Sequence, residues 1–129
     1  MYKISQLLLI LYIASRGGRS RLPRLHLFNW ALKTRERHST LVEAAKQKKL
    51  TLAAWGFDPA FAIAIRYAIA EGLVREVSSA YELTERGHAV AKAVLADPDV
   101  LTEDKSALLA IGKGITETMV EDVAKGWES

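Results

Sequence analysis

The chain begins with a segment in which apolar side chains recur at helical spacing, and most positions between them are apolar as well. We therefore predict a helix over residues 2–15 that ends at Gly17 and Gly18. A helix that is apolar nearly all round belongs in the middle of a core or in an interface.

Two more helices are predicted before residue 50. Residues 22–34 keep one apolar face, and Pro23 stands in the first turn, where its missing N–H group costs nothing. Residues 35–49 form the most polar helical stretch of the chain, with only a thin apolar stripe. This stretch is either a surface helix or an extension of the helix before it.

A helix followed by a hairpin is predicted in the middle of the chain. Asp58 can accept a hydrogen bond from free backbone N–H groups, and Pro59 suits the first helical position, so a helix begins there and runs to Glu71. Residues 73–77 and 81–84 have strand-like composition on either side of a short turn. They indicate a small antiparallel hairpin.

Three helices are predicted in the remaining sequence. Thr84 can cap a helix over residues 85–96, and Asp97-Pro98 closes it. Another helix opens at Thr102 and ends near Gly112, and the last follows Thr116. The last helix carries an apolar stripe made of Met119, Val120, Val123 and Trp127.

Helices followed by a two-stranded hairpin predict a mainly α fold of the winged-helix type, a variant of the helix-turn-helix with the hairpin as its wing. We predict a winged-helix domain over residues 1–84 with an inserted polar helix. Residues 85–129 are expected to form a C-terminal helical extension that packs on this domain, so that the two make one compact unit.

Composition narrows the function classes. The chain has 129 residues, enough for a single core, and it has no cysteine, which excludes disulfides, cysteine-bound metals and thiol catalysis within this sequence. The longest apolar run, LLLILYIA, is less than half the length of a membrane span of about 20 residues. We therefore expect a cytoplasmic protein that does not cross a membrane.

The formal net charge of +3 hides a strong asymmetry. Residues 1–50 contain 11 Lys and Arg against two acids, a formal charge of +9, and the residues after them contain 7 against 13, a charge of −6. The basic part is a candidate for contact with a DNA backbone, with an acidic protein surface, or with solvent alone. The candidate DNA-backbone residues are Arg16, Arg19, Arg21, Arg24, Lys33, Arg35, Arg37, Lys46, Lys48 and Lys49.

The helix in the position of a recognition helix has the sequence PAFAIAIRYAIAE, and only Arg66 and Tyr67 in it are plausible readers of base edges. A helix of this composition suits burial against protein better than sequence readout. The predicted protein interface consists of Phe61, Ile65 and Ile69 together with the stripe Met119, Val120, Val123 and Trp127.

The sequence carries no motif for catalysis, a metal or a cofactor. His26, His38 and His88 lie on separate predicted helices without metal-ligand spacing. The glycines near residues 17 and 112 lack the pattern of a phosphate-binding loop. We expect neither an enzyme nor a protein with a small-molecule substrate.

Four segments in order, RLPRLHLFNWALKT, FDPAFAIAIRYAIAEGLV, YELTERG and ALLAIGKGITETMVEDV, resemble the middle components of bacterial ABC three-component systems. These are small winged-helix subunits similar to the kite accessory proteins of SMC complexes, and Lamassu-type antiphage systems contain one. The resemblance implies a non-catalytic subunit whose partner is an SMC-like coiled-coil ATPase. Through that ATPase it implies an effector, such as a nuclease, that acts against phage or plasmid DNA.

Two other functions remain open from the sequence. A winged-helix transcriptional regulator would read an operator as a dimer, with the wing and Arg66 near the grooves. The other open function is that of an antitoxin-like or structural subunit of an unrelated assembly.

Overall fold

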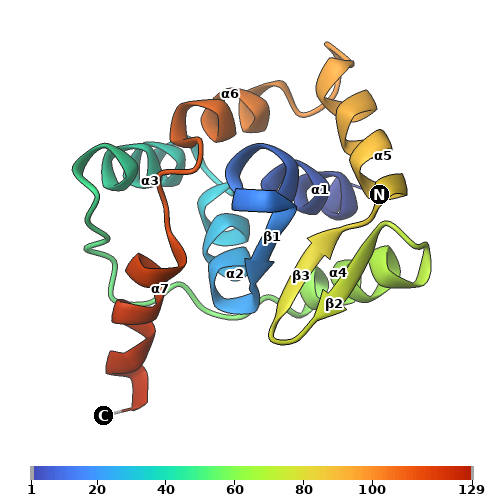
Figure 1. Ribbon diagram of the computed structural model, residues 1–129. Helices are drawn as coiled ribbons and strands as arrows, with labels where there is room; N and C mark the ends of the chain where they lie inside the picture. The colour runs from blue at the N-terminus through green and yellow to red at the C-terminus, as the bar shows by residue number, and fades with distance from the viewer. Residues whose placement is uncertain (1, 129) are drawn as a thin grey trace.

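The most apolar helix lies at the centre of the molecule. In the computed structural model, which describes residues 2–128, helix α1 (Tyr2–Ala14) is surrounded by α2, α4, α5 and α6 (Figure 1). Leu7, Leu9, Ile10 and Leu11 are fully buried, although they point in different directions around its axis. Of the two places that the sequence left open for this helix, the core or an interface, the structure shows the core.

A small antiparallel sheet lies beside α1. The turn η1 (Arg16–Gly18) leads into β1 (Arg19–Arg21), which pairs with β3 (Ala80–Leu83), and β3 pairs on its other edge with β2 (Val74–Val77). The predicted hairpin is β2 and β3. The sequence did not predict β1, which makes the sheet three-stranded.

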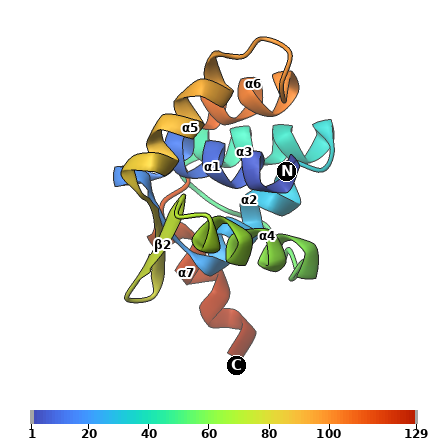
Figure 2. The same ribbon diagram turned by 90° about the vertical axis from the view of Figure 1, so that its right-hand side faces the viewer.

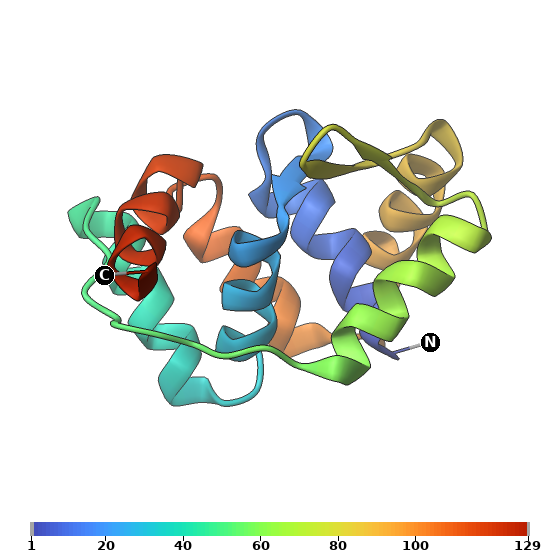
Figure 3. The ribbon, with the colours of Figure 1, turned by 90° about the horizontal axis from the view of Figure 1, so that it is seen from below.

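Two of the middle helices begin at side-chain caps, while the helix before them has none. Helix α2 (Leu22–Ala31) is shorter than expected, because Thr34 accepts a hydrogen bond from the backbone N–H of Arg37 and starts α3 (Arg35–Gln47) as a separate helix. Segment 48–58 has no helix or strand and runs past α2 to α4 (Pro59–Ala70), as Figure 3 shows.

The C-terminal helices share the core of the rest. Helix α5 (Glu85–Ala96) has the predicted bounds, and α6 (Thr102–Ile111) and α7 (Glu117–Ala124) are followed by the turn η2 (Lys125–Glu128). Figure 2 shows α5 and α6 as a layer over α1, with α4 on the opposite side. Side chains of α5, α6 and α7 belong to the same buried cluster as those of α1.

The described part of the chain is thus mainly helical with one small three-stranded antiparallel sheet, an architecture compatible with a winged-helix-like fold. Among residues 2–128, no helix combines the length and the apolar character needed to cross a membrane.

Candidate protein-binding surface

Helix α4 has one face in the core and one face in solvent. Its inward face consists of Phe61, Ala64, Ile65 and Ala68, all buried. Phe61 and Ile65 were predicted to contact a partner protein, and this prediction is wrong, because both side chains are already used in the protein's own core. The error lies in the rotational phase of the helix about its axis.

The outward face of α4 is apolar with one charge. We call it the α4 surface, and it consists of the exposed residues Ala60, Ile63, Arg66, Tyr67 and Ala70. The exposed fractions of Ile63 and Tyr67 are 46% and 61%, high for large apolar side chains. Ile69, another predicted interface residue, lies on the flank of this face and is 37% exposed. An exposed apolar helix face of this kind is typical of a protein interface.

Asp58 fixes the start of α4 relative to α1 and α2. Its Oδ1 accepts the backbone N–H of Ala60 at 3.0 Å, and its Oδ2 accepts the Asn29 amide at 3.0 Å and the Lys33 ammonium at 3.1 Å. Lys3 of α1 adds an ion pair at 3.3 Å. The hydrogen bond from Asn29, together with the Lys33, Ala60 and Lys3 bonds, holds the pKa of this carboxyl well below its usual range.

Helix α7 packs on its own protein rather than standing free. Val120 is buried, so its predicted role in a partner interface is wrong, and Met119 and Val123 are half-buried against the same core. Trp127, in the turn η2 that follows α7, is exposed, but its indole N–H donates to the Ala53 carbonyl at 2.8 Å. The apolar stripe of α7 therefore mainly holds the C-terminal segment on the domain.

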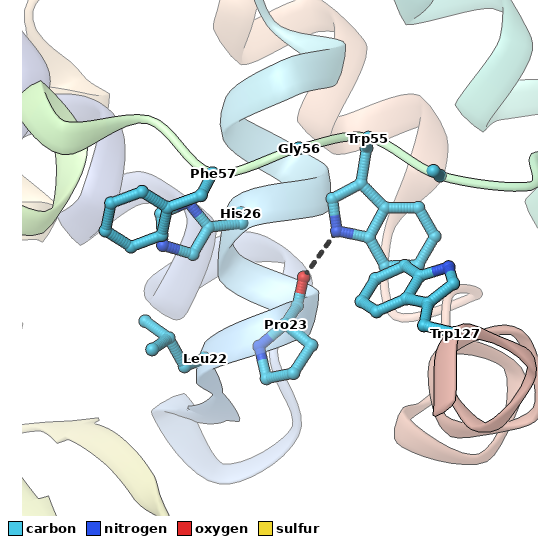
Figure 4. A pocket seen from close by; sticks show the side chains of 8 residues that line it. Leu22, Pro23, His26, Trp55, Gly56, Phe57 and Trp127 are labelled. Carbon is cyan, nitrogen blue, oxygen red and sulfur yellow. Dashed lines mark hydrogen bonds between the residues drawn. The ribbon is translucent and has the colours of Figure 1, made fainter. Parts of the chain in front are cut away.

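A pocket lies between the start of α2, segment 54–57 and Trp127 (Figure 4). It encloses about 400 Å³, and nearly all of its wall is apolar. Trp55 meets Trp127 edge to face with ring centroids 4.8 Å apart, and the Trp55 indole N–H donates to the Pro23 carbonyl at 3.0 Å. Both indole donors are thus satisfied by backbone, and the pocket presents aromatic surface.

His26 also lines this pocket, against Phe57 at a centroid distance of 4.7 Å (Figure 4). It is buried, and neither ring nitrogen has a hydrogen-bond partner among the described residues. Burial lowers the pKa of the imidazole, an effect that Asp58 only partly offsets, so the ring is neutral at pH 7. Within residues 2–127, no group of three His, Asp or Glu side chains is placed to hold a metal ion.

Four of the ten predicted DNA-backbone residues form ion pairs within the protein. Arg19 contacts Glu82 at 3.3 Å, Arg21 contacts Glu121 at 2.8 Å, Lys33 contacts Asp58, and Arg35 contacts Glu103. Arg37 lies over the Trp30 ring, with its guanidinium carbon 4.6 Å from the ring centroid. Counting Lys3 with Asp58, five of the eleven Lys and Arg in residues 1–50 pair with acids of the described acidic part, so the basic part is partly neutralised.

Arg24 is the clearest departure from expectation. Only 3% of this residue is exposed, and its guanidinium donates to the carbonyls of Ala14 and Ile115 and to the Ser15 hydroxyl. The prediction that Arg24 contacts a DNA backbone is wrong, because its donors join α1, α2 and the α6–α7 connection. Four predicted cations stay exposed and without an ion pair among the described residues, namely Arg16, Lys46, Lys48 and Lys49.

Sequence reasoning missed Phe57, Ile63 and Tyr67 as exposed apolar residues. One signal could have found two of them. Arg66 is the only charged residue inside α4, so the face that carries it is the solvent face, and Ile63 and Tyr67 share that face at helical spacing.

Comparisons with known proteins give no relative: no family model, no curated protein and no solved structure matches the chain.

Proposed function

We propose that the chain is a winged-helix protein in which α4 takes the place of the recognition helix and the β2–β3 hairpin is the wing. The order α1, β1, α2, α4, β2, β3 and the sheet order β1-β3-β2 support this assignment. In this reading α3 is an insertion before α4, and α5, α6 and α7 form the C-terminal extension that completes the core.

We further propose that it is a non-catalytic accessory subunit of a cytoplasmic defence complex, and that it binds an SMC-like coiled-coil ATPase coupled to an effector such as a nuclease. The apolar character of the α4 surface is the observation that carries the proposal. A helix that reads DNA presents several polar side chains to base edges, whereas this face offers Arg66 alone as a charged group. The resemblance of four sequence segments to middle components of three-component systems supports an SMC-like ATPase as the partner.

The spacing on the α4 surface suits a helical partner. Ala60, Ile63, Tyr67 and Ala70 recur at intervals of three and four residues, so they form one stripe along the helix. The two alanines leave room for a partner backbone to approach, and Ile63 and Tyr67 provide the apolar area that would be buried. Tyrosine is also among the residues most often found at the energetic centre of interfaces.

The test is an affinity purification of the tagged chain from its own host, treated with nuclease so that bridging DNA is removed. The wild-type chain should recover a large coiled-coil ATPase in stoichiometric amount, and Tyr67→Glu should lose it. Leu109→Glu is the matched control, because Leu109 on α6 is as exposed as Tyr67, at 61% each. Recovery of the wild-type chain alone, or equal loss with both variants, would contradict the proposal.

A second candidate is a DNA-binding regulator, and the position of Arg66 favours it. Arg66 is exposed on the outward face of α4 and has no ion pair among the described residues, so its guanidinium is free to contact a base or a phosphate. This function requires a preference for the chain's own upstream DNA that persists at physiological salt and is lost in Arg66→Ala.

A further inference from the structure

Arg24 carries a buried positive charge with no carboxylate bonded to it. Its Nε donates to the Ile115 carbonyl at 2.7 Å, Nη1 donates to the Ser15 hydroxyl at 2.8 Å, and Nη2 donates to the Ala14 carbonyl. All three acceptors are neutral. A buried charge is usually paired with an opposite charge, because neutral acceptors return only part of the hydration free energy that burial removes.

A hollow of about 340 Å³ lies next to this side chain. Three more cations line it, Arg16 and Arg19 from the segment after α1 and Lys113 from the α6–α7 connection. Arg16 and Lys113 are exposed and have no ion pair among residues 2–127. Arg19 shares Glu82 with Arg75, whose Nε lies closer to that carboxylate, at 2.9 Å against 3.3 Å.

The hollow has one carboxylate in its wall, Glu117 in the first turn of α7. Glu117 accepts the backbone N–H of Arg21 at 2.9 Å, and its charge raises the pKa of Arg24. Burial outweighs that effect and lowers the pKa of the Arg24 guanidinium to about 10. Apart from Arg19, which contacts Glu82, three cations therefore face a single carboxylate around the hollow.

We propose that this hollow binds a phosphate group, either as a free phosphate or diphosphate ion or as the phosphate of a mononucleotide. Arg16 and Lys113 donate to the phosphate oxygens, and the buried Arg24 in the wall of the hollow acts through its charge. A phosphate matches the site because it carries up to two negative charges and several acceptor oxygens, which cations from separate segments can bind at once. The volume lies within the range of about 300 to 1,000 Å³ typical of small-ligand pockets.

The site shares no residue with the α4 surface, so it stands or falls independently of the proposed function. A DNA duplex is a poorer match than a small phosphate compound, because Arg24 is 3% exposed and lies too deep for a rigid double helix to reach. The threonine hydroxyls of Thr116 and Thr118 in the wall are further groups able to donate to phosphate oxygens.

The test is calorimetric titration of the full chain with inorganic phosphate, pyrophosphate and AMP at constant ionic strength in a chloride buffer. Saturable binding should weaken about tenfold in Lys113→Gln and in Arg16→Gln, since each loses one charge-assisted hydrogen bond. Lys92→Gln, which removes an exposed cation of α5 outside the hollow, is the control and should bind as the wild type does. Glu117→Gln should bind more tightly, because it removes the one repelling carboxylate.

Equal affinity for AMP and inorganic phosphate would support recognition of the phosphate alone, and tighter binding of AMP would support a nucleotide. The proposal is overturned if none of the three compounds saturates the chain. It is also overturned if Lys113→Gln binds as the wild type does, if Lys92→Gln weakens binding as much, or if a short DNA duplex binds while the three compounds do not. Circular dichroism of each variant checks that the fold is intact.

Discussion

At the scale of single residues, the buried His26 contributes to the dependence of stability on pH. His26 is buried, its ring nitrogens have no hydrogen-bond partner in the part of the chain that the structure describes, and burial keeps its pKa below the usual value near 6.5. The unfolded chain therefore takes up a proton at this residue more readily than the folded chain does as the pH falls below that value. Stability should decrease with falling pH through that range.

We predict that His26→Leu removes this dependence and raises the free energy of unfolding at pH 6 by about 1 kcal/mol, because an unsatisfied buried polar ring is replaced by an apolar side chain. Urea unfolding of both proteins at pH 5, 6 and 7 measures the effect. His88→Leu is the control, because His88 is exposed. A wild-type chain as stable at about pH 5 as at about pH 7 would contradict the argument.

The sequence identifies charged residues but not which of them fold inward. Arg24 stands in the same basic run as Arg21, and nothing local separates the two. The difference arises because Ala14, Ser15 and Ile115 bring acceptors to Arg24, and Ile115 lies 91 residues further along the chain. Burial of Arg24 is therefore a tertiary effect that a sequence pattern does not contain.

At the scale of elements, one close contact sets the position of α5 on the hairpin. Gly87 in the first turn of α5 lies against the backbone at the start of β2, and a Cβ atom there would stand 1.9 Å from the Leu73 carbonyl oxygen. Thr84, which caps α5, also donates its hydroxyl to the Gly72 carbonyl at 2.6 Å. Helix and hairpin are thus joined without room for a side chain at residue 87.

We predict that Gly87→Ala lowers the free energy of unfolding by about 2 kcal/mol, because the displacement of backbone outweighs the better helix propensity of alanine. Thermal or urea unfolding measures the loss. Gly126→Ala is the control, since among the described residues other than its chain neighbours no heavy atom lies within 4 Å of the Cβ it would add. Equal stability of the two variants would contradict the prediction, because it would mean that the backbone around Leu73 can move to accommodate the added methyl group at little cost.

Elements with strong local signals were predicted well and those made by tertiary pairing were not. The bounds of α5 follow from the Thr84 cap and the Asp97-Pro98 stop, both local. In contrast, β1 has three residues, Arg19, Ser20 and Arg21, with no strand-like composition, and it forms only because β3 pairs with it. The apolar residues of α4 were predicted correctly. Because they occur on nearly every side of the helix, the sequence did not show which side faces the core, and the predicted solvent-facing side was wrong.

At the scale of the whole molecule, the charge asymmetry of the sequence becomes a set of internal contacts. The ion pairs that Lys and Arg form among the described residues join a base in residues 1–50 to an acid in residues 51–128, except for Arg75 with Glu82 within the sheet. Attraction between the two parts of the chain thus favours the folded state. It also leaves less free basic surface than the sequence suggested.

We predict that raising NaCl from about 0.01 M to about 0.5 M lowers the urea midpoint of unfolding, because salt screens these largely exposed pairs. Urea is uncharged and so leaves the salt effect visible. The double variant Arg21→Gln, Glu121→Gln lacks one pair and should show a smaller decrease. A midpoint that stays constant or rises with salt would mean that the pairs contribute little.

The central position of α1 also has a consequence for synthesis. Helix α1 leaves the ribosome before α4, α5 and α6, which cover it and begin 45, 71 and 88 residues after the end of α1. At translation rates of about 5 to 20 residues per second, the most apolar helix stays uncovered for several seconds in the nascent chain. Folding of the core is therefore completed late, and a chain interrupted before α6 exposes the surface that most favours aggregation.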